Sequence, residues 1–407
     1  MGIAKSDRDI TIPAPEPIGP PGAARVLNTG EPAASCSPAV SRSRAIPSPV
    51  IALLGKKDVP TDGVEDYWRS LGPAIENRGY KVEIVRVAWD GRGWIRAWVD
   101  LWRKSRKWKG IPVLAQYTAL MWSRRGFSLP FLVVLLTLKV RGARLITVFH
   151  DIAPYSGKRV IDRIRRACQL LVLRRAYGWA QAAVVTVPME ELGWLQRPRT
   201  RTSFIPVGAS IPPMMALDKS SRHGHEPRTI AVFSITGGGV VGNEVADIAF
   251  AANEAARQVP QLKLVTLGRG SLEAEPRLRQ ALVESAVKYS ALGVLCPQEV
   301  AKVLAGADVS LFVRGRISTQ RTTAVASIAC SLPLVAYADG CLASPLAEAG
   351  VVAVPCGDRQ ALAAAVVKVL TDGQLWLDLH QRSRRAYEKY FSWEAVATRF
   401  VDLLDRA

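Results

Sequence analysis

The sequence lacks several patterns that would place it in a well-marked class. Its six cysteines form no C-x-x-C pair and have no zinc-like spacing, so we expect free, mostly buried thiols in a reducing compartment. The chain does not open with an apolar segment of signal-peptide type. The longest apolar run, Phe127–Val140, is too short to cross a bilayer comfortably. These features predict a cytoplasmic protein without a transmembrane helix.

Acidic residues are also scarce. The 407 residues include 35 Asp and Glu against 54 Lys and Arg, a formal net charge of +19. This excess favours contact with an anionic partner, which could be nucleic acid, a phospholipid surface or a phosphorylated ligand. Because the sequence contains no nucleic-acid recognition module, we expect no nucleic-acid partner.

What the chain does contain is a regular alternation of strand-like and helix-like segments. Residues 1–46 are rich in Pro, Gly, Ala and Ser and predict a disordered tail. The segments in 47–209 and in 229–390 predict two doubly wound α/β domains, joined by a polar connector at 210–228. A last helix at 391–407 is expected to return to the first domain. Ligands in such sheets bind where strands end, so we expect a site between the two domains.

The stretch at 315–340, "GRISTQRTTAVASIACSLPLVAYADG", predicts a polar loop, a short helix from Thr322 to Cys330 and a buried strand. Amides at a helix N-terminus and arginine side chains suit a diphosphate. The alternative is a solvated loop of a degenerate site. The candidate donor and phosphate residues here are Arg314, which immediately precedes the stretch, and Arg316, Arg321, Thr322 and Thr323 within it.

Two further strand ends carry candidate anion-binding groups. Gly238 and Gly239 lie in a glycine run that could form a nest of backbone N–H groups, or only a flexible turn. Arg269, between two glycines, follows the next strand and is the leading additional cation.

Several segments, in this order, resemble the GT-B glycosyltransferases, in particular the family 4 (glycosyl transferases group 1) enzymes. They include "TVFHDIAP", "FIPVGASIP", "LKLVTLGRGS", "VAKVLAGADVSLFV" and "ACSLPLVAYADG", and the similarity covers about residues 48–402. The resemblance implies two Rossmann-like domains facing across a cleft. It also implies transfer of a sugar from a nucleotide-sugar donor, with retention and without a catalytic metal or other cofactor. A glycan or lipid-linked acceptor would lie beside Asp62 and Gly63; the oligomeric state stays open.

The chain departs from the family at one important point. Many members have a Glu-x7-Glu pair, whose second glutamate binds the ribose of the nucleotide; the matching positions here are Ser318 and Ala326. Alanine cannot accept a hydrogen bond from a ribose hydroxyl. A non-catalytic, glycosyltransferase-like scaffold is therefore the alternative function. A nucleotide-sugar epimerase is disfavoured because few carboxylates are available as acid and base.

His150 ends a predicted strand and is followed by Asp151. A neutral imidazole at a strand end can bond a sugar hydroxyl or take a proton from the acceptor. The resemblance places the matching histidine beside the donor sugar, so His150 and Asp151 are the catalytic candidates. The alternative is a histidine that only holds the turn.

A basic, tryptophan-rich segment at 89–110 predicts a helix with one aromatic stripe, formed by Trp94, Trp98 and Trp102. Cations lie on either side of this stripe, which suits contact with an anionic membrane surface. The stripe could equally pack on the domain core, with its cations only solvated.

Overall fold

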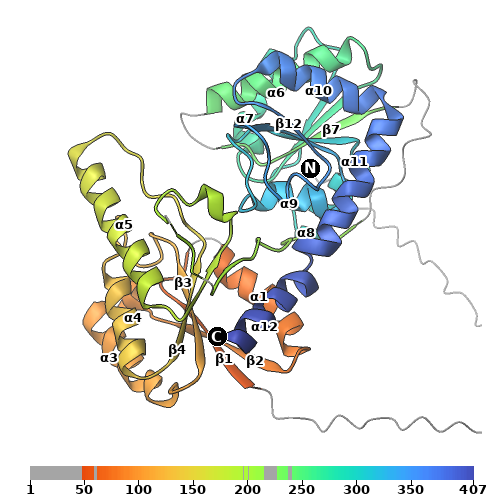
Figure 1. Ribbon diagram of the computed structural model, residues 1–407. Coiled ribbons are helices and arrows are strands. Elements are labelled where there is room, and N and C mark those ends of the chain that lie inside the picture. Colours follow the sequence, from red (N-terminus) through yellow and green to blue (C-terminus); the bar gives the residue numbers. More distant parts are fainter. Residues whose placement is uncertain (1–47, 59–61, 196, 200, 215–226, 237–240) are drawn as a thin grey trace, which may run out of the picture. The chain divides into compact units, whose positions relative to one another are not determined.

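Two parallel six-stranded sheets form the framework of the protein, as the computed structural model shows (Figure 1). The structure describes residues 48–58, 62–195, 197–199, 201–214, 227–236 and 241–407. The tail expected at 1–46 and residues 215–226 of the expected connector lie outside them. The first sheet has the order β2-β1-β3-β4-β5-β6. Its strands are β1 (Ser48–Leu54), β2 (Tyr80–Arg86), β3 (Pro112–Tyr117), β4 (Arg144–Phe149), β5 (Ala182–Val185) and β6 (Thr202–Phe204).

The second sheet has the order β12-β11-β10-β7-β8-β9. This is the Rossmann order, in which the first strand lies at the centre and the strand order reverses beside it. The reversal lies between β7 and β10, where Val309 pairs with Ile230. A ligand is therefore expected at the carboxyl ends of these two strands. The strands are β7 (Thr229–Phe233), β8 (Lys263–Leu267), β9 (Lys288–Ala291), β10 (Val309–Phe312), β11 (Leu334–Ala338) and β12 (Val351–Pro355).

Helices cover both faces of the first sheet. On one face lie α1 (Gly63–Glu76) and α12 (Trp393–Arg406), and on the other lie α3 (Trp94–Lys104), α4 (Pro130–Val140) and α5 (Val160–Trp179) (Figure 1). A short helix, α2 (Trp89–Arg92), precedes α3. The second sheet is accompanied by α6 (Val241–Ala256), α7 (Ser271–Ala281), α8 (Pro297–Gly306), α9 (Thr322–Ala329), α10 (Arg359–Thr371) and α11 (Gly373–Ala386).

The C-terminal helix packs on the first sheet's helix layer. Ser392 caps α12 by accepting a hydrogen bond from the Ala395 amide. The apolar face of α12 then meets α1, where the rings of Phe400 and Trp68 lie 5.6 Å apart, centre to centre. The last residues of the chain thus complete the core of the first half.

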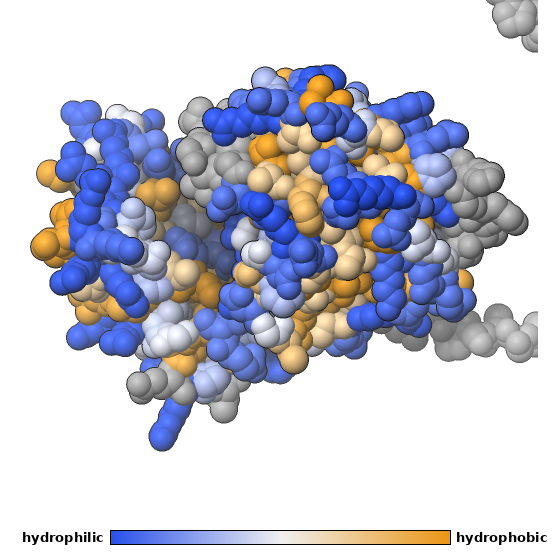
Figure 2. Space-filling view, turned by 90° about the horizontal axis from the view of Figure 1, so that it is seen from above, coloured by the Kyte–Doolittle hydropathy of each residue, from blue (hydrophilic) through white to orange (hydrophobic). Residues whose placement is uncertain are grey.

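Helix α4 is unusual for a helix at the surface of a protein. Nearly all its residues are apolar, and only the side facing the sheet is buried. In Figure 2, orange side chains lie among blue ones at the left edge, on the side where Figure 1 shows α3, α4 and α5. Among the residues that the structure describes, none of the helices has the length and hydrophobicity needed to span a membrane.

One segment of the second half differs from the sequence-based expectation. The sequence pattern predicts a helix at 276–290 and a strand at 292–296, but α7 ends at Ala281 and the strand lies earlier, at Lys288–Ala291 (β9). Pro276, the first residue of the predicted helix, lies inside α7, which begins five residues earlier at Ser271. The exposure of the thiols also differs from the sequence-based expectation of mostly buried cysteines. Cys296, Cys341 and Cys356 are exposed.

The contact between α1 and α12 gives a test of stability. Replacing the fully buried Phe400 with alanine should lower the free energy of unfolding by about 3–5 kcal/mol, because a large ring is lost and a cavity is left. Urea denaturation measures this change. Arg406→Ala, on the exposed end of the same helix, is the control, and a Phe400→Ala effect as small as that of the control would contradict the packing.

Candidate functional site

Three loops meet at the carboxyl ends of β7, β8 and β10. The Arg314 Nε, after β10, lies 3.4 Å from the Thr236 Oγ1, after β7, and so bridges the point where the strand order reverses. The Ile235 amide donates to the Arg269 carbonyl oxygen at 2.9 Å, which joins the loop after β8. Residues from three predicted strand ends therefore lie together.

Arg321 adds a second guanidinium to this edge of the sheet. It precedes α9, whose first residues are Thr322 and Thr323. Partial burial and the positive charge of Arg314 both lower the pKa of Arg321. Two guanidinium groups that repel each other beside a helix N-terminus form a site that an anion would stabilise.

The other predicted phosphate residues are placed differently. Arg316 is on the same loop, but its guanidinium pairs with the Glu191 carboxylate at 3.0 Å. The Arg269 side chain is exposed at the end of β8. Gly238 and Gly239 lie outside the described residues. Of the predicted phosphate residues, Arg314, Arg321 and the start of α9 therefore form the candidate anion site.

The loop before α9 contacts the first half of the chain directly. The Gln320 Nε2 donates to the His150 carbonyl oxygen at 2.6 Å and to the Thr186 Oγ1 at 2.7 Å. The Thr319 Oγ1 donates to the Thr186 carbonyl oxygen at 2.6 Å. The residue before Arg321 therefore bonds the main chain of His150. Sequence reasoning missed Gln320 and Thr186, although the position of Gln320 between Arg316 and Arg321 is a visible polar signal.

The side chain of His150 is held in one orientation by Gln116 on β3. The Gln116 Nε2 donates to the Leu114 carbonyl oxygen at 2.8 Å, so its Oε1 faces the imidazole. The His150 Nε2 lies 2.8 Å from that oxygen and must donate to it. The ring of Tyr67 packs edge-on against the imidazole, with centres 5.5 Å apart. These contacts leave the Nδ1 of a neutral His150 as a hydrogen-bond acceptor.

Burial lowers the pKa of His150 to about 4. The imidazole is therefore neutral at pH 7 and can accept a hydrogen bond without a change of protonation. Sequence reasoning missed Gln116, although a glutamine inside the apolar strand "PVLAQY" is a signal that could have identified it.

Asp151 lines a basic cavity at the ends of β3 and β4. The cavity has a volume of about 540 Å³, and its lining includes Arg124, Arg125 and Arg165. Burial raises the pKa of Asp151, and a hydrogen bond from the Ala119 amide only partly offsets this. A carboxylate of raised pKa beside a cationic cavity is suited to accepting a proton.

The carboxylate of Asp62 makes structural contacts with the start of α1 and with Arg86. Its Oδ1 accepts hydrogen bonds from the amides of Val64 and Glu65 at 3.1 Å each, which caps α1. Its Oδ2 pairs with Arg86 at 2.6 Å. Burial opposes this ionised state, but the Glu65 amide and the Arg86 guanidinium lower the pKa of Asp62. The adjacent Gly63 is exposed and begins α1.

The two positions that match the family's glutamates have different surroundings. Ser318 is half-buried in the loop, and its carbonyl oxygen accepts from the Arg321 amide. Ala326 is fully buried in an apolar cluster with Leu267, Val300 and Cys330. The side chain of Ala326 is therefore closed to any ligand.

The tryptophan stripe is only partly exposed. Trp98 is 39% exposed, whereas Trp94 is half-buried and stacked on Trp89. Trp102 is half-buried beneath the guanidinium of Arg141, 3.6 Å from the ring centre. Only one of the three indoles is thus presented to solvent as a membrane contact would require.

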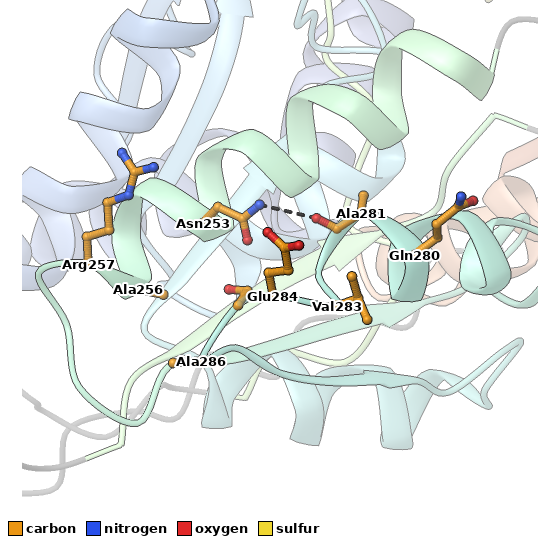
Figure 3. A pocket seen from close by; sticks show the side chains of 9 residues that line it. Asn253, Ala256, Arg257, Gln280, Ala281, Val283, Glu284 and Ala286 are labelled. Carbon is orange, nitrogen blue, oxygen red and sulfur yellow. Dashed lines mark hydrogen bonds between the residues drawn. The ribbon is translucent and has the colours of Figure 1, made fainter.

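A second cavity, of about 530 Å³, lies between α6 and α7 (Figure 3). The Asn253 side chain donates to the Ala281 carbonyl oxygen at 3.2 Å across it. Both residues lie in the last turns of their helices, at the edge of the sheet where the strands begin. This cavity is therefore remote from Arg314 and Arg321, and Glu284 makes its lining a poor diphosphate site.

Comparisons with known proteins agree with the fold described above, in which two parallel sheets are flanked by helices. Residues 238–372, a third of the chain, match the sequence model of the family described as Glycosyl transferases group 1. Sucrose-phosphate synthase from Thermosynechococcus elongatus has a similar structure, with a TM-score of 0.63 and 18% identity. That match covers 88% of this chain and 98% of the synthase. The chain has the GT-B fold.

Two other GT-B structures support this assignment. HepE from Anabaena, solved in complex with UDP and glucose, has a TM-score of 0.58 at 14% identity, covering 88% of this chain and 100% of HepE. The lipopolysaccharide outer core galactosyltransferase WaaB has a TM-score of 0.53 at 12% identity, covering 88% and 99%. No curated protein sequence matches the chain significantly. The predicted resemblance and the two-sheet α/β fold are confirmed.

The lowered pKa of His150 predicts that the folded protein loses stability in acid. The unfolded chain takes up a proton near pH 6.5, whereas the folded protein does so only near pH 4, so acid favours the unfolded state. Between pH 7 and pH 4.5, His150 should lower the free energy of unfolding by about 2–3 kcal/mol. Urea denaturation of wild type and His150→Gln at both pH values isolates this contribution. An equal acid loss in the two proteins would contradict it.

Proposed function

We propose that this protein is a metal-independent glycosyltransferase that moves a sugar from a nucleotide-sugar to a glycan or lipid-linked acceptor. Residues 47–209 would hold the acceptor and residues 229–390 the donor. The observation that carries the proposal is the placement of Arg314, Arg321 and the start of α9 at the reversal point of a Rossmann sheet. The match of residues 238–372 to the group 1 glycosyltransferases supports it.

Arg314 and Arg321 would hold the diphosphate of the donor. As the sugar leaves, negative charge develops on the diphosphate, and a preorganised positive environment stabilises it. The two guanidinium groups and the first amides of α9 supply that environment, with the hydroxyls of Thr322 and Thr323 as further donors. No metal is then needed to stabilise the leaving group. HepE is solved with UDP-glucose as well as UDP, so UDP-sugars are the first donors to test.

His150 would orient the sugar whose bond is broken. Its main chain is bonded by Gln320, next to Arg321, so the imidazole belongs to the same neighbourhood as the diphosphate site. Its free Nδ1 can accept a hydrogen bond from a sugar hydroxyl, while Gln116 and Tyr67 fix the ring. Such fixed positioning is a major source of rate enhancement.

Asp151 and the basic cavity beside it would serve the acceptor. The raised pKa of Asp151 suits it to accept the proton of the attacking hydroxyl. The three arginines that line the cavity favour an acceptor with phosphate or carboxylate groups, as in a lipid diphosphate or a polysaccharide precursor. Retention of anomeric configuration is proposed from the family resemblance and is measured on the product by NMR.

A panel of nucleotide-sugars tests the proposed function. Each is scored for thermal stabilisation of the protein and for slow hydrolysis, which needs no acceptor. We expect that one UDP-sugar stabilises the protein and is slowly hydrolysed by it. Both effects should occur without an added metal and in the presence of a chelator. Failure of every nucleotide-sugar to stabilise the protein would reject the donor site.

The second candidate function is a non-catalytic scaffold of the same fold. It is favoured by Ala326, which is buried where many relatives have the ribose-binding glutamate. A scaffold would show neither hydrolysis nor nucleotide-dependent stabilisation, whereas an enzyme with a different ribose contact would show both. The panel therefore separates the two functions directly.

Arg321→Ala tests the diphosphate site. Loss of a charge-assisted hydrogen bond should weaken binding of UDP by about 1.5–3 kcal/mol, measured by isothermal titration calorimetry. Arg316→Ala on the same loop is the matched control, because its guanidinium already pairs with Glu191. Equal losses in the two variants would point to a general electrostatic effect, and no loss in Arg321→Ala would move the site elsewhere.

His150→Ala tests the catalytic assignment. Turnover should fall by about 10²-fold or more, while the affinity for UDP stays nearly unchanged, because the imidazole contacts the sugar and not the nucleotide. Steady-state kinetics with the donor found in the panel, together with calorimetry, measure both quantities. Normal turnover in this variant would remove His150 from the mechanism.

A further inference from the structure

Nearly all the net positive charge of the chain is concentrated in one quarter of it. Residues 91–180 contain 19 Lys and Arg against three Asp and no Glu, a net charge of +16 out of the total of +19. This segment includes α3, α4 and α5, which form the helix layer on one face of the first sheet. Many of its cations, including Arg96, Lys104, Lys107 and Lys139, are exposed.

The same helix layer exposes apolar side chains in a regular row. Leu129, Val133, Leu136 and Val140, along α4, are between 42% and 64% exposed. Their spacing of four, three and four residues places them on one side of the helix, over about 16 Å of its length. Scattered apolar residues at a surface are ordinary, but a continuous row along one helix marks an interaction surface.

Helix α3 extends this surface. Ile95 is 81% exposed, and Trp98, one turn later, is 39% exposed. Between α3 and α4 lies a groove of about 430 Å³ whose lining residues are all apolar. They are Val87, Trp94, Ile95, Trp98, Leu129, Pro130, Val133 and Val134.

The two helices are fixed to each other, so the groove is preformed. The Trp98 Nε1 donates to the Thr137 Oγ1 at 3.0 Å, which turns the polar edge of the indole inward. The Arg141 guanidinium covers the Trp102 ring and donates to the Trp102 carbonyl oxygen at 3.0 Å. The apolar edges of the side chains are consequently the ones left outside.

We propose that the α3–α4 face docks on the surface of an anionic lipid bilayer. The apolar row and the groove enter the boundary between headgroups and acyl chains, while the surrounding Lys and Arg contact anionic headgroups. Charge complementarity selects this occupant. A second copy of the chain would bring its own cations against these, and nucleic acid offers nothing to cover an apolar row.

This surface differs from the one expected from the sequence. The tryptophan stripe contributes chiefly Trp98, and the main insertion residues are Ile95, Val133, Leu136 and Val140. None of them belongs to the proposed donor or catalytic site. The proposal therefore holds or fails independently of the glycosyltransferase activity.

Flotation with vesicles tests the proposal on the full-length protein. Vesicles of phosphatidylcholine alone are compared with vesicles that also contain phosphatidylglycerol, at low and at high salt. We expect at least tenfold stronger partition into the anionic vesicles at low salt, and a marked decrease at high salt, because the cations attract the headgroups. Equal partition into neutral vesicles would overturn the charge argument.

Two pairs of variants locate the surface. Ile95→Gln with Val133→Gln should reduce binding to anionic vesicles at least tenfold. The matched control is Val283→Gln with Val294→Gln, two valines that are 79% and 76% exposed in the second half.

The charges are tested in the same way. Lys104→Glu with Lys107→Glu should reduce binding at least tenfold, whereas Lys302→Glu with Lys368→Glu, in the second half, should have little effect. Equal effects from face and control pairs would show that binding is not localised and would overturn the proposal.

Analytical ultracentrifugation without lipid tests whether a second copy of the chain covers the α3–α4 face instead of a bilayer. A dimer that Ile95→Gln with Val133→Gln disrupts, in a protein that does not float with anionic vesicles, would show that a second copy covers this face. That result would also overturn the proposal. Circular dichroism and thermal unfolding of each variant confirm that the fold is intact.

Discussion

The side chain of Gln320 is the constraint on which the candidate site depends. Its amide bonds the main chain of His150 and the hydroxyl of Thr186, both at strand ends of the first sheet. Gln320 itself precedes the arginine that begins α9 in the second half. A strand-end histidine and a helix-end cation, 171 residues apart in sequence, are thereby brought to one place. Neither sheet alone contains both groups that the proposed sugar transfer would use.

Positive charge shapes the candidate site in the second half of the chain, and burial shapes it in the first half. In the second half, the guanidinium groups of Arg314 and Arg321 raise the positive potential beside α9, which favours an anion. In the first half, burial keeps His150 neutral and raises the pKa of Asp151. The cationic groups would thus bind the leaving group, while the neutral imidazole and the carboxyl group would address the sugar and the acceptor.

The departure at Ala326 and the exposed α3–α4 face show how a shared fold is adapted. Ala326, the position that matches the family's ribose-binding glutamate, is part of an apolar cluster, so in the proposed function affinity for a nucleotide would come from the diphosphate and from other contacts. The first half, by contrast, carries cations and apolar side chains beyond what folding requires, since buried residues already fill its core. A lipid-borne acceptor would join these two features in one function, because the proposed membrane-docking surface lies in the same half as the proposed acceptor site.

The sequence by itself determined the α/β class, the alternation of elements and the short helix at Thr322. These depend on local apolar periodicity, caps and glycines, which are readable over a few residues. It also identified His150 and Arg321 as candidates, from strand-end and helix-start positions. It misplaced β9, because most residues of that strand were assigned to the preceding helix.

Only the tertiary structure decided which of these residues act together. The tautomer of His150 depends on Gln116 across the sheet, and the charge of Arg316 is offset by Glu191, 125 residues away. Likewise, periodicity showed that α4 is apolar, but not which side remains exposed once the sheet covers the other. Partners distant in sequence settle orientation, protonation and exposure, and no local pattern records them.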